Sequence, residues 1–177
     1  MFKQRFITGL LLFVLVLLII FLLPMTLFLS LTSLVFLLAA WEWSLLLKLH
    51  SWFRFFYVLA IGVAMLFLSP VAALIVLWAA AIWWLLALFW IVIYPQGARV
   101  WNQGIWVRAC MGFFTLLPSW LAINIIRSAE NGAAILLFLL LLVCATDVGA
   151  YLFGRWLGKH LLAPHVSPKK TQEGLVG

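Results

Sequence analysis

Charged residues are scarce in this sequence. Asp, Glu, Lys and Arg make up only 8% of its 177 residues, and just four of the charged residues are acidic. A typical soluble domain carries about 25% charged residues, so these few side chains could not cover a soluble globule. Hydrophobic residues reach 68%, and the mean hydropathy is +1.27. The composition excludes a soluble, disordered or collagen-like chain and indicates a polytopic helical membrane protein.

Cysteine is rarer still, since only Cys110 and Cys144 are present. They lack the spacing of metal ligands, and no disulfide framework is indicated. We interpret both as small residues packed in an apolar core. The net charge of +7 is explained first by membrane topology, because cytoplasmic loops of membrane proteins are enriched in Lys and Arg. It also favours anionic lipid or phosphate partners. We expect no nucleic-acid partner.

Long apolar runs predict an all-α polytopic membrane protein of about six transmembrane helices. The spans are predicted at 6–23, 25–47, 55–68, 71–93, 109–126 and 133–153. The third run is short, so its helix is expected to begin earlier or to tilt little. No small-residue cleavage site follows the first run, which we interpret as an uncleaved span. Residues 1–153 then form the transmembrane region, and 154–177 form a short basic cytoplasmic segment.

The basic residues predict how the chain crosses the membrane. With the N-terminus in the cytoplasm, ten of the eleven Lys and Arg residues lie inside and only Arg127 lies outside. Cytoplasmic loops are enriched in these residues. An even number of spans returns the C-terminus to the same side. We therefore expect a multi-pass protein of the inner (cytoplasmic) membrane with both termini in the cytoplasm.

Two carboxylates, Glu42 and Asp147, lie within predicted spans, where an ionisable group is costly and is functional by default. Glu42 lies five residues from the inner end of its span, and Asp147 lies six residues from the end of its own. The helical rise puts them roughly 7–9 Å deep. The two could share one water-filled cavity open to the cytoplasm. The alternative is that each reaches the interface or pairs with Arg54 or Arg155.

The segment Ser167-Pro168-Lys169-Lys170-Thr171 follows the last span. Serine before proline predicts a helix that begins with Ser167 as the N-cap and Pro168 at the first position. A helix N-terminus attracts anions, and two lysines with a threonine hydroxyl favour phosphate. The alternative is a basic tail that touches acidic lipid headgroups. Upstream, the glycines 149, 154 and 158 permit close approach of a helix or a ligand.

Taken together, these segments resemble a known family. The runs DVGAY at 147–151, GRWLGKH at 154–160, Pro164 and SPKKTQEG at 167–174 closely resemble phosphatidate cytidylyltransferase, or CDP-diacylglycerol synthase. AAWEW at 39–43 and Tyr94-Pro95 agree more loosely. Family members normally continue well beyond this length with a C-terminal signature. The resemblance therefore suggests a C-terminally truncated sequence in which 154–177 begins the missing part.

The resemblance implies a nucleotidyltransferase of phospholipid biosynthesis. Such an enzyme condenses CTP with phosphatidic acid to CDP-diacylglycerol and pyrophosphate, and it requires Mg²⁺. The implied catalytic residues are Asp147 and Lys170. The resemblance also implies a set of phosphate-binding residues, namely Ser167, Lys169, Lys170 and Thr171. It implies two metal ligands, Asp147 and Glu173. Glu42 stays a candidate intramembrane polar site from its position alone.

Two other functions stay open. The chain could be a non-catalytic membrane scaffold or partner of a lipid-synthesis enzyme, or a transporter fragment with Glu42 and Asp147 along its pathway. The transporter is disfavoured because the specific motif continues into the basic tail, and no inverted repeat is evident. The expected partners are CTP, phosphatidic acid and membrane lipids. A second copy of the chain, forming a homodimer, is a further candidate partner. Because the family's C-terminal signature is missing, we expect no turnover by this chain alone.

Overall fold

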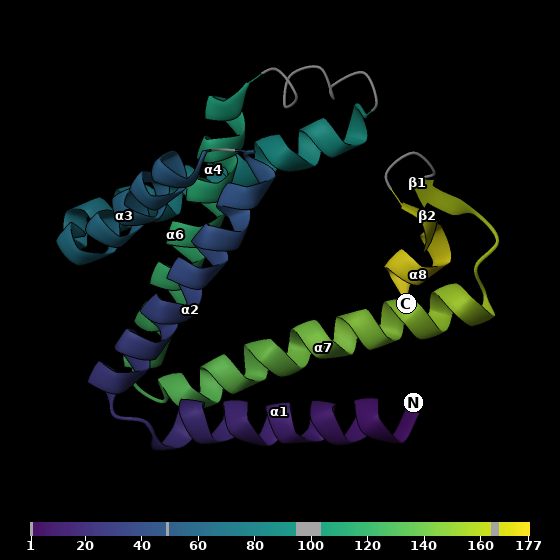
Figure 1. Ribbon diagram of the computed structural model, residues 1–177. Coiled ribbons are helices and arrows are strands. Elements are labelled where there is room, and N and C mark those ends of the chain that lie inside the picture. The colour runs from purple at the N-terminus through teal and green to yellow at the C-terminus, as the bar shows by residue number, and fades with distance from the viewer. Residues whose placement is uncertain (1, 49, 95–103, 164–166) are drawn as a thin grey trace.

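A computed structural model of the chain describes residues 2–48, 50–94, 104–163 and 167–177 (Figure 1). Pro95 and Pro164 of the family resemblance lie outside these residues. The long helices are α1 (Phe2–Leu22), α2 (Met25–Leu46), α3 (Ser51–Phe67), α4 (Pro70–Val92), α6 (Ile105–Ser128) and α7 (Gly132–Trp156). A two-stranded antiparallel hairpin, β1 (Leu161–Ala163) and β2 (Ser167–Thr171), leads to the short helix α8 (Gln172–Val176).

The long helices leave most of their apolar surface uncovered. Helices α2, α4, α6 and α7 are long and apolar enough to cross a membrane, and Ile7–Leu22 and α3 are shorter apolar helices. In the most apolar 18-residue stretch of α4, and again in that of α7, only 6% of the residues are buried. Exposed apolar faces of this extent require lipid around them. The predicted all-α polytopic membrane fold is therefore confirmed.

One expectation is confirmed and one needs correction in this setting. Helix α3 begins at Ser51, four residues before the predicted bound, as one of the two alternatives for the short third span expected, and this adds about one turn. Cys110 and Cys144 are free and exposed, so their assignment to an apolar core is wrong. Apolar surroundings in a membrane protein are supplied by lipid as well as by the protein interior, and the sequence pattern is the same for both.

The main core lies between α2, α3 and α6, which cross closely in Figure 1. Its buried residues are Ala40, Ile61, Met65, Leu117, Trp120 and Leu121. Three residues of α4 pack against this cluster, namely Ala73, Val76 and Leu77. A second cluster of Ile20, Phe28 and Leu136 joins α1, α2 and α7. The two clusters leave α7 attached to the bundle near its N-terminal end, so its C-terminal half is free to carry the hairpin.

Polar side chains fix the beginning of α6 against α2 and α3. The indole Nε1 of Trp43 donates to the Arg108 carbonyl at 3.0 Å, and the Tyr57 hydroxyl donates to the Ala109 carbonyl at 3.1 Å. Gly112 lies beneath both rings, and a Cβ there would overlap them. Because polar groups have no water partner in lipid, these bonds satisfy the aromatic donors and join three helices.

Arg127 connects the two turns at the opposite end of the bundle. Its Nη2 donates to the Leu23 carbonyl at 3.2 Å, and its guanidinium carbon lies 5.5 Å from the centroid of the Phe28 ring. The α1–α2 turn and the α6–α7 turn consequently lie side by side (Figure 1). These are two of the turns that the basic-residue pattern predicts outside the cytoplasm.

Candidate functional site

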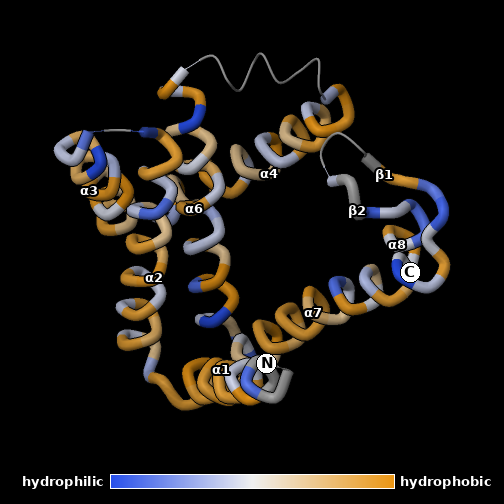
Figure 2. The backbone as a smooth tube through the Cα atoms, turned by 45° about the vertical axis from the view of Figure 1, so that its right-hand side comes forward, coloured by the Kyte–Doolittle hydropathy of each residue, from blue (hydrophilic) through white to orange (hydrophobic). Residues whose placement is uncertain are grey.

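A cavity of about 520 Å³ lies where the C-terminal half of α7 meets the hairpin and α8. Figure 2 shows the change of character at this place, from the largely hydrophobic α7 to hydrophilic stretches just before β1 and along β2, while β1 itself is hydrophobic. The lining residues come from every element of this region: Asp147, Ala150, Tyr151, Gly154, Arg155, Leu162, Ser167, Lys170, Thr171, Gly174 and Leu175. The cavity is therefore bordered by an apolar membrane helix on one side and by a cationic strand on the other.

Backbone pairing explains how the hairpin closes over α7. Leu161 pairs with Thr171, and Ala163 pairs with Ser167, in an antiparallel register. The amide of Gln172 donates to the His160 carbonyl at 2.9 Å and extends this pairing. The Thr171 Oγ1 then accepts from the Gly174 amide at 3.2 Å as the N-cap of α8. This cap stabilises the turn from β2 into α8.

The predicted helix start at Ser167 and Pro168 is wrong. Both residues belong to strand β2, and the helix begins at Gln172 with Thr171 as its N-cap. Pairing of this segment with β1 overrides the local preference of Ser-Pro for a helix start. A short-range sequence pattern does not reveal such a pairing partner. Proline is tolerated here because each strand of a two-stranded sheet is an edge strand. The predicted phosphate contacts therefore have no helix N-terminus at Ser167 to support them and depend on side chains of this strand.

Glycines allow α8 and β2 to lie directly on the end of α7. A Cβ on Gly174 would come within 2.7 Å of the Ala150 carbonyl oxygen and 3.1 Å of the Gly154 Cα. A Cβ on Gly158 would lie 2.8 Å from the Thr171 Cγ2. Gly154 and Gly158, which the sequence marked for close approach, and Gly174, which it did not, thus let the hairpin and α8 lie on α7.

Four of the predicted site residues line the cavity together. Asp147 and Lys170 are exposed, while Ser167 and Thr171 are half-buried. Lys169 belongs to β2, but its side chain lies outside what the structure describes. Glu42 lies exposed on α2 and is absent from the described lining. The structure therefore does not bring Glu42 and Asp147 together, since α2 packs on α3 and α6 while Asp147 lies on the free half of α7.

Arg155 and Tyr151 are lining residues that the sequence analysis did not assign to the site. The Arg155 Nη1 donates to the Tyr151 hydroxyl at 2.9 Å. They lie four residues apart on α7, a spacing that places side chains on one helix face, and Asp147 lies a further four residues back. That periodicity was the signal that could have found them. The lining thus combines one carboxylate, two cations and three hydroxyls, a set suited to phosphate groups.

Glu173 closes the loop between α7 and the hairpin. Its Oε2 accepts from the Lys159 amide at 3.1 Å, and both carboxylate oxygens accept from the His160 amide at 3.3 Å. The His160 Nδ1 lies 2.7 Å from Oε1. The hydrogen bond from His160, followed by the backbone donors, lowers the pKa of Glu173 from its ordinary value of 4.5 to about 2. An ionised Glu173 therefore holds the start of the hairpin.

Metal binding by these carboxylates stays a prediction. Asp147 lines the cavity, whereas Glu173 is not part of its described lining and is engaged with His160. Among the residues that the structure covers, no three His, Cys, Asp or Glu side chains gather into a metal-binding group. Mg²⁺ is commonly held by one or two carboxylates together with substrate phosphates and water. The arrangement fits that mode, with Asp147 as the carboxylate on the cavity wall.

The low pKa of Glu173 predicts a pH dependence for the hairpin. Because the folded pKa lies below the ordinary value, the stabilisation is present above about pH 4.5 and is lost as the pH falls towards 2. We expect a carboxyl titration midpoint near 2 by ¹³C NMR of the full chain in detergent. His160→Ala should raise that midpoint, because it removes the largest cause of the shift. An unchanged midpoint in this variant would contradict the geometry.

The comparisons with known proteins agree across the chain. Residues 3–177 match the model of the Cytidylyltransferase family. A phosphatidate cytidylyltransferase of Pseudomonas aeruginosa is 37% identical over 180 residues, which cover 100% of this chain and 66% of that protein. The enzyme of the same name from Haemophilus influenzae is 31% identical over 199 residues, covering 100% of this chain and 68% of the relative. The chain thus spans about two thirds of the length of these curated relatives.

A shorter segment is more similar to a third relative. Over 51 residues, which are 29% of this chain and 20% of the relative, the identity to a phosphatidate cytidylyltransferase of Staphylococcus saprophyticus is 51%. No solved structure matches the chain.

Proposed function

Because the chain belongs to the Cytidylyltransferase family, we propose that it acts in the transfer of a cytidylyl group from CTP to phosphatidic acid, in phospholipid biosynthesis. The observation that carries this proposal is the single cavity that gathers Asp147, Arg155 and Lys170 at the end of an apolar helix. In the reaction, a phosphate oxygen of the lipid forms a bond to the α-phosphorus of CTP. The bond from that phosphorus to the bridging oxygen breaks, and pyrophosphate leaves with the electron pair.

The lining residues suit this reaction because two anions must meet. Lys170 and Arg155 offset the repulsion between the lipid phosphate and the nucleotide, and they stabilise charge that moves onto the leaving group. The hydroxyls of Ser167, Thr171 and Tyr151 can donate to phosphate oxygens. Charge-assisted hydrogen bonds of this kind are stronger than neutral ones. Binding and orientation are therefore the main contributions of these residues.

We propose Mg²⁺ as the metal that accompanies the nucleotide, with Asp147 as a protein ligand. The ion supplies positive charge to the phosphates when it is bound. The Asp147 carboxylate lies on the cavity wall, where it can hold such an ion or orient a cation. A role for Glu173 as a second metal ligand is kept as a prediction.

The position of the cavity suits one lipid and one water-soluble substrate. Leu142 and Val143, one turn before Asp147, are exposed apolar residues of α7, and acyl chains can lie along such a surface. Lys170 and Ser167 line the cavity from the hydrophilic strand β2. The lipid thus arrives from the bilayer and CTP arrives from water.

The direct test uses membranes that contain this chain and no other cytidylyltransferase. The missing C-terminal signature predicts no turnover by this chain alone, whereas the cavity that gathers Asp147, Arg155 and Lys170 favours turnover. If the proposal holds, labelled phosphatidic acid becomes CDP-diacylglycerol only when CTP and Mg²⁺ are both present. Binding of CTP to the purified chain is measured in parallel by calorimetry. Retained CTP binding without turnover would favour the non-catalytic partner, whereas the absence of both product and CTP binding would refute the proposed function.

We also propose the membrane orientation in which both termini and the cavity face the cytoplasm. The ten-to-one distribution of basic residues supports it. The contact of Arg127 with Leu23 agrees with two turns that lie on one and the same side of the membrane. Cytoplasmic CTP could then reach the cavity.

Cysteine labelling tests this orientation. In a background with Cys110 and Cys144 replaced by alanine, Lys159→Cys should react with a membrane-impermeant maleimide only after intact cells are opened. Glu130→Cys, exposed in the α6–α7 turn, should react in intact cells and serves as the matched control. The reverse pattern would overturn the orientation.

A further inference from the structure

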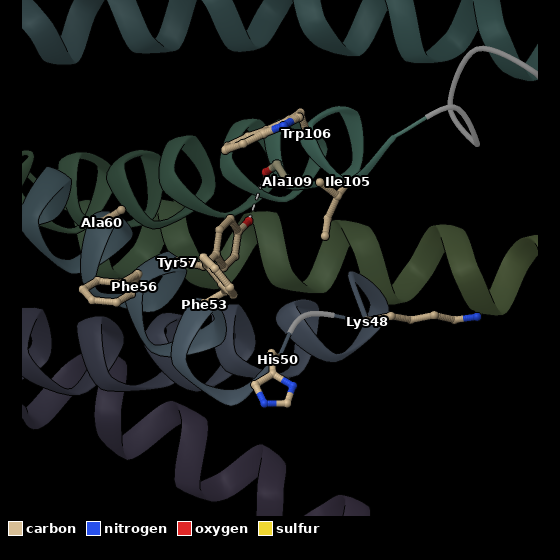
Figure 3. A pocket seen from close by; sticks show the side chains of 9 residues that line it. All are labelled: Lys48, His50, Phe53, Phe56, Tyr57, Ala60, Ile105, Trp106 and Ala109. Atoms are coloured by element: carbon tan, nitrogen blue, oxygen red, sulfur yellow. Dashed lines mark hydrogen bonds between the residues drawn. The ribbon is translucent and has the colours of Figure 1, made fainter.

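A second cavity, of about 630 Å³, lies between the first half of α3 and the first turns of α6 (Figure 3). It is separate from the Asp147–Lys170 cavity, because α3 and the hairpin lie on opposite sides of the molecule in both Figure 1 and Figure 2. Its lining residues are Lys48, His50, Phe53, Phe56, Tyr57, Ala60, Ile105, Trp106 and Ala109. We call it the α3–α6 groove.

The walls of the α3–α6 groove are apolar and aromatic. Phe53, Phe56 and Trp106 are all exposed, and Trp106 retains 80% of its accessible surface. The Tyr57 hydroxyl is already used by the Ala109 carbonyl at 3.1 Å, as the dashed line in Figure 3 shows. The walls therefore offer apolar surface in place of free polar groups. An occupant of these walls has to be hydrocarbon.

The rim of the groove has the opposite character. Lys48 and His50 come from the α2–α3 turn, and Figure 3 shows the Lys48 side chain extending away from the aromatic rings. The described lining contains no acidic residue. On α6, between Ile105 and Ala109, the Arg108 Nε is buried and has no hydrogen-bond partner in the part of the chain that the structure describes. The described lining of the groove thus carries basic groups at its rim and no carboxylate.

The backbone at Lys48 adds a second observation. Its φ of 53° lies in the left-handed region, which favours glycine at the end of a helix. Its amide donates to the Leu45 carbonyl at 3.0 Å. Lysine in this left-handed conformation is less stable than glycine would be, because its Cβ crowds the backbone. Strained positions are commonly found at functional sites, and this one places a cation at the mouth of an apolar groove.

We propose that the α3–α6 groove binds one phospholipid with an anionic headgroup. An acyl chain lies against Phe53, Phe56 and Trp106, and the headgroup phosphate meets Lys48. A neutral detergent or a zwitterionic lipid can contact the same apolar walls, but its headgroup has a weaker electrostatic attraction to Lys48. This lipid site is independent of cytidylyl transfer, because it shares no lining residue with the cavity of the proposed function.

The test measures lipid bound to the full chain by native mass spectrometry in a non-ionic detergent. The probes are dioleoyl-phosphatidylglycerol and dioleoyl-phosphatidylcholine, which share acyl chains and differ in headgroup charge. We expect roughly fivefold tighter binding of the anionic lipid, the value for one basic residue near an anionic surface. Neither CTP nor phosphatidic acid is present, so failure here is distinct from failure of the proposed function.

Two variants separate the rim from the walls. Lys48→Ala should reduce the preference towards equal binding of the two lipids, whereas Lys159→Ala, which removes the same charge elsewhere, should keep it. Trp106→Ala should weaken binding of both lipids, and Trp78→Ala on α4 is the matched control. Both tryptophans are largely exposed, at 80% and 66%, so their removal leaves the core intact.

The proposal is overturned by either of two results. One is an unchanged headgroup preference in Lys48→Ala. The other is equal retention of lipid in Trp106→Ala and Trp78→Ala. Ala60→Phe, which places a ring in the groove, is compared with Ala134→Phe on the exposed face of α7. Displacement of lipid by the first and not by the second supports the site, and equal binding by the two counts against it.

Discussion

Replacing Lys170 by alanine is expected to lower the rate of cytidylyl transfer by about 10²- to 10³-fold, the usual effect of removing one preorganised electrostatic donor. Lys170 lines the same cavity as Asp147 and Arg155, and its ammonium offsets charge on the phosphates that react. The measurement is CTP-dependent formation of CDP-diacylglycerol by membranes that carry equal amounts of each variant. CTP binding to the purified chain is the parallel readout and should weaken as well.

Lys159→Ala is the matched control for Lys170→Ala. Lys159 is exposed and its side chain is not part of the described lining of the cavity, so its removal should leave the rate near that of the wild type. Asp147→Asn keeps the shape of the side chain and removes its charge. It should reduce the rate and weaken the dependence on Mg²⁺. Turnover that is unchanged in both Lys170→Ala and Asp147→Asn would contradict these site assignments.

Gly174→Ala is expected to separate α8 from α7. The added Cβ would lie 2.7 Å from the Ala150 carbonyl oxygen and 3.1 Å from the Gly154 Cα. Both are backbone atoms of a long helix, which cannot move aside as a flexible side chain can. Overpacking of this kind costs about 1–3 kcal/mol. Hydrogen exchange should therefore show amide protection in α8 and β2 falling by about 5- to 150-fold.

Gly9→Ala on α1 provides the control for this experiment, because a Cβ at Gly9 meets no heavy atom within 4 Å. It should leave exchange in the hairpin and α8 unchanged. Gly174→Ala should also lower cytidylyl transfer, since Thr171 and Lys170 lose their position beside α7. Full amide protection in Gly174→Ala would show that α8 does not depend on this close contact.

The comparison of sequence and structure is most instructive around β2. Lys170, Ser167 and Asp147 could be proposed from residue type and motif, and the structure brings them into one cavity. The local geometry could not be proposed in the same way. Ser167-Pro168 carries the signal of a helix start, yet these residues pair with β1. Strand pairing depends on a partner that a short-range pattern does not include.

For the charged residues Glu173 and Glu42, too, the sequence did not predict which groups lie beside them in the folded chain. The family resemblance implies metal binding by Glu173, and the structure shows its carboxylate accepting bonds from the Lys159 and His160 amides and lying against the His160 ring. Glu42 and Asp147 have similar predicted depths, but similar depth does not make two helices neighbours. Which helices pack together depends on side-chain fit across the whole bundle.

By itself, the sequence determined that this chain is a helical membrane protein, approximately where its helices run, and which family it resembles. These properties follow from composition, from the length of apolar runs and from the identity of local motifs. Only the tertiary structure decided that α8 and β2 lie on α7, that Arg155 and Tyr151 join Lys170, and that Lys48 stands at the mouth of an apolar groove. Those arrangements depend on contacts between residues far apart in the chain, where close packing at glycines and pairing of backbone groups determine the geometry.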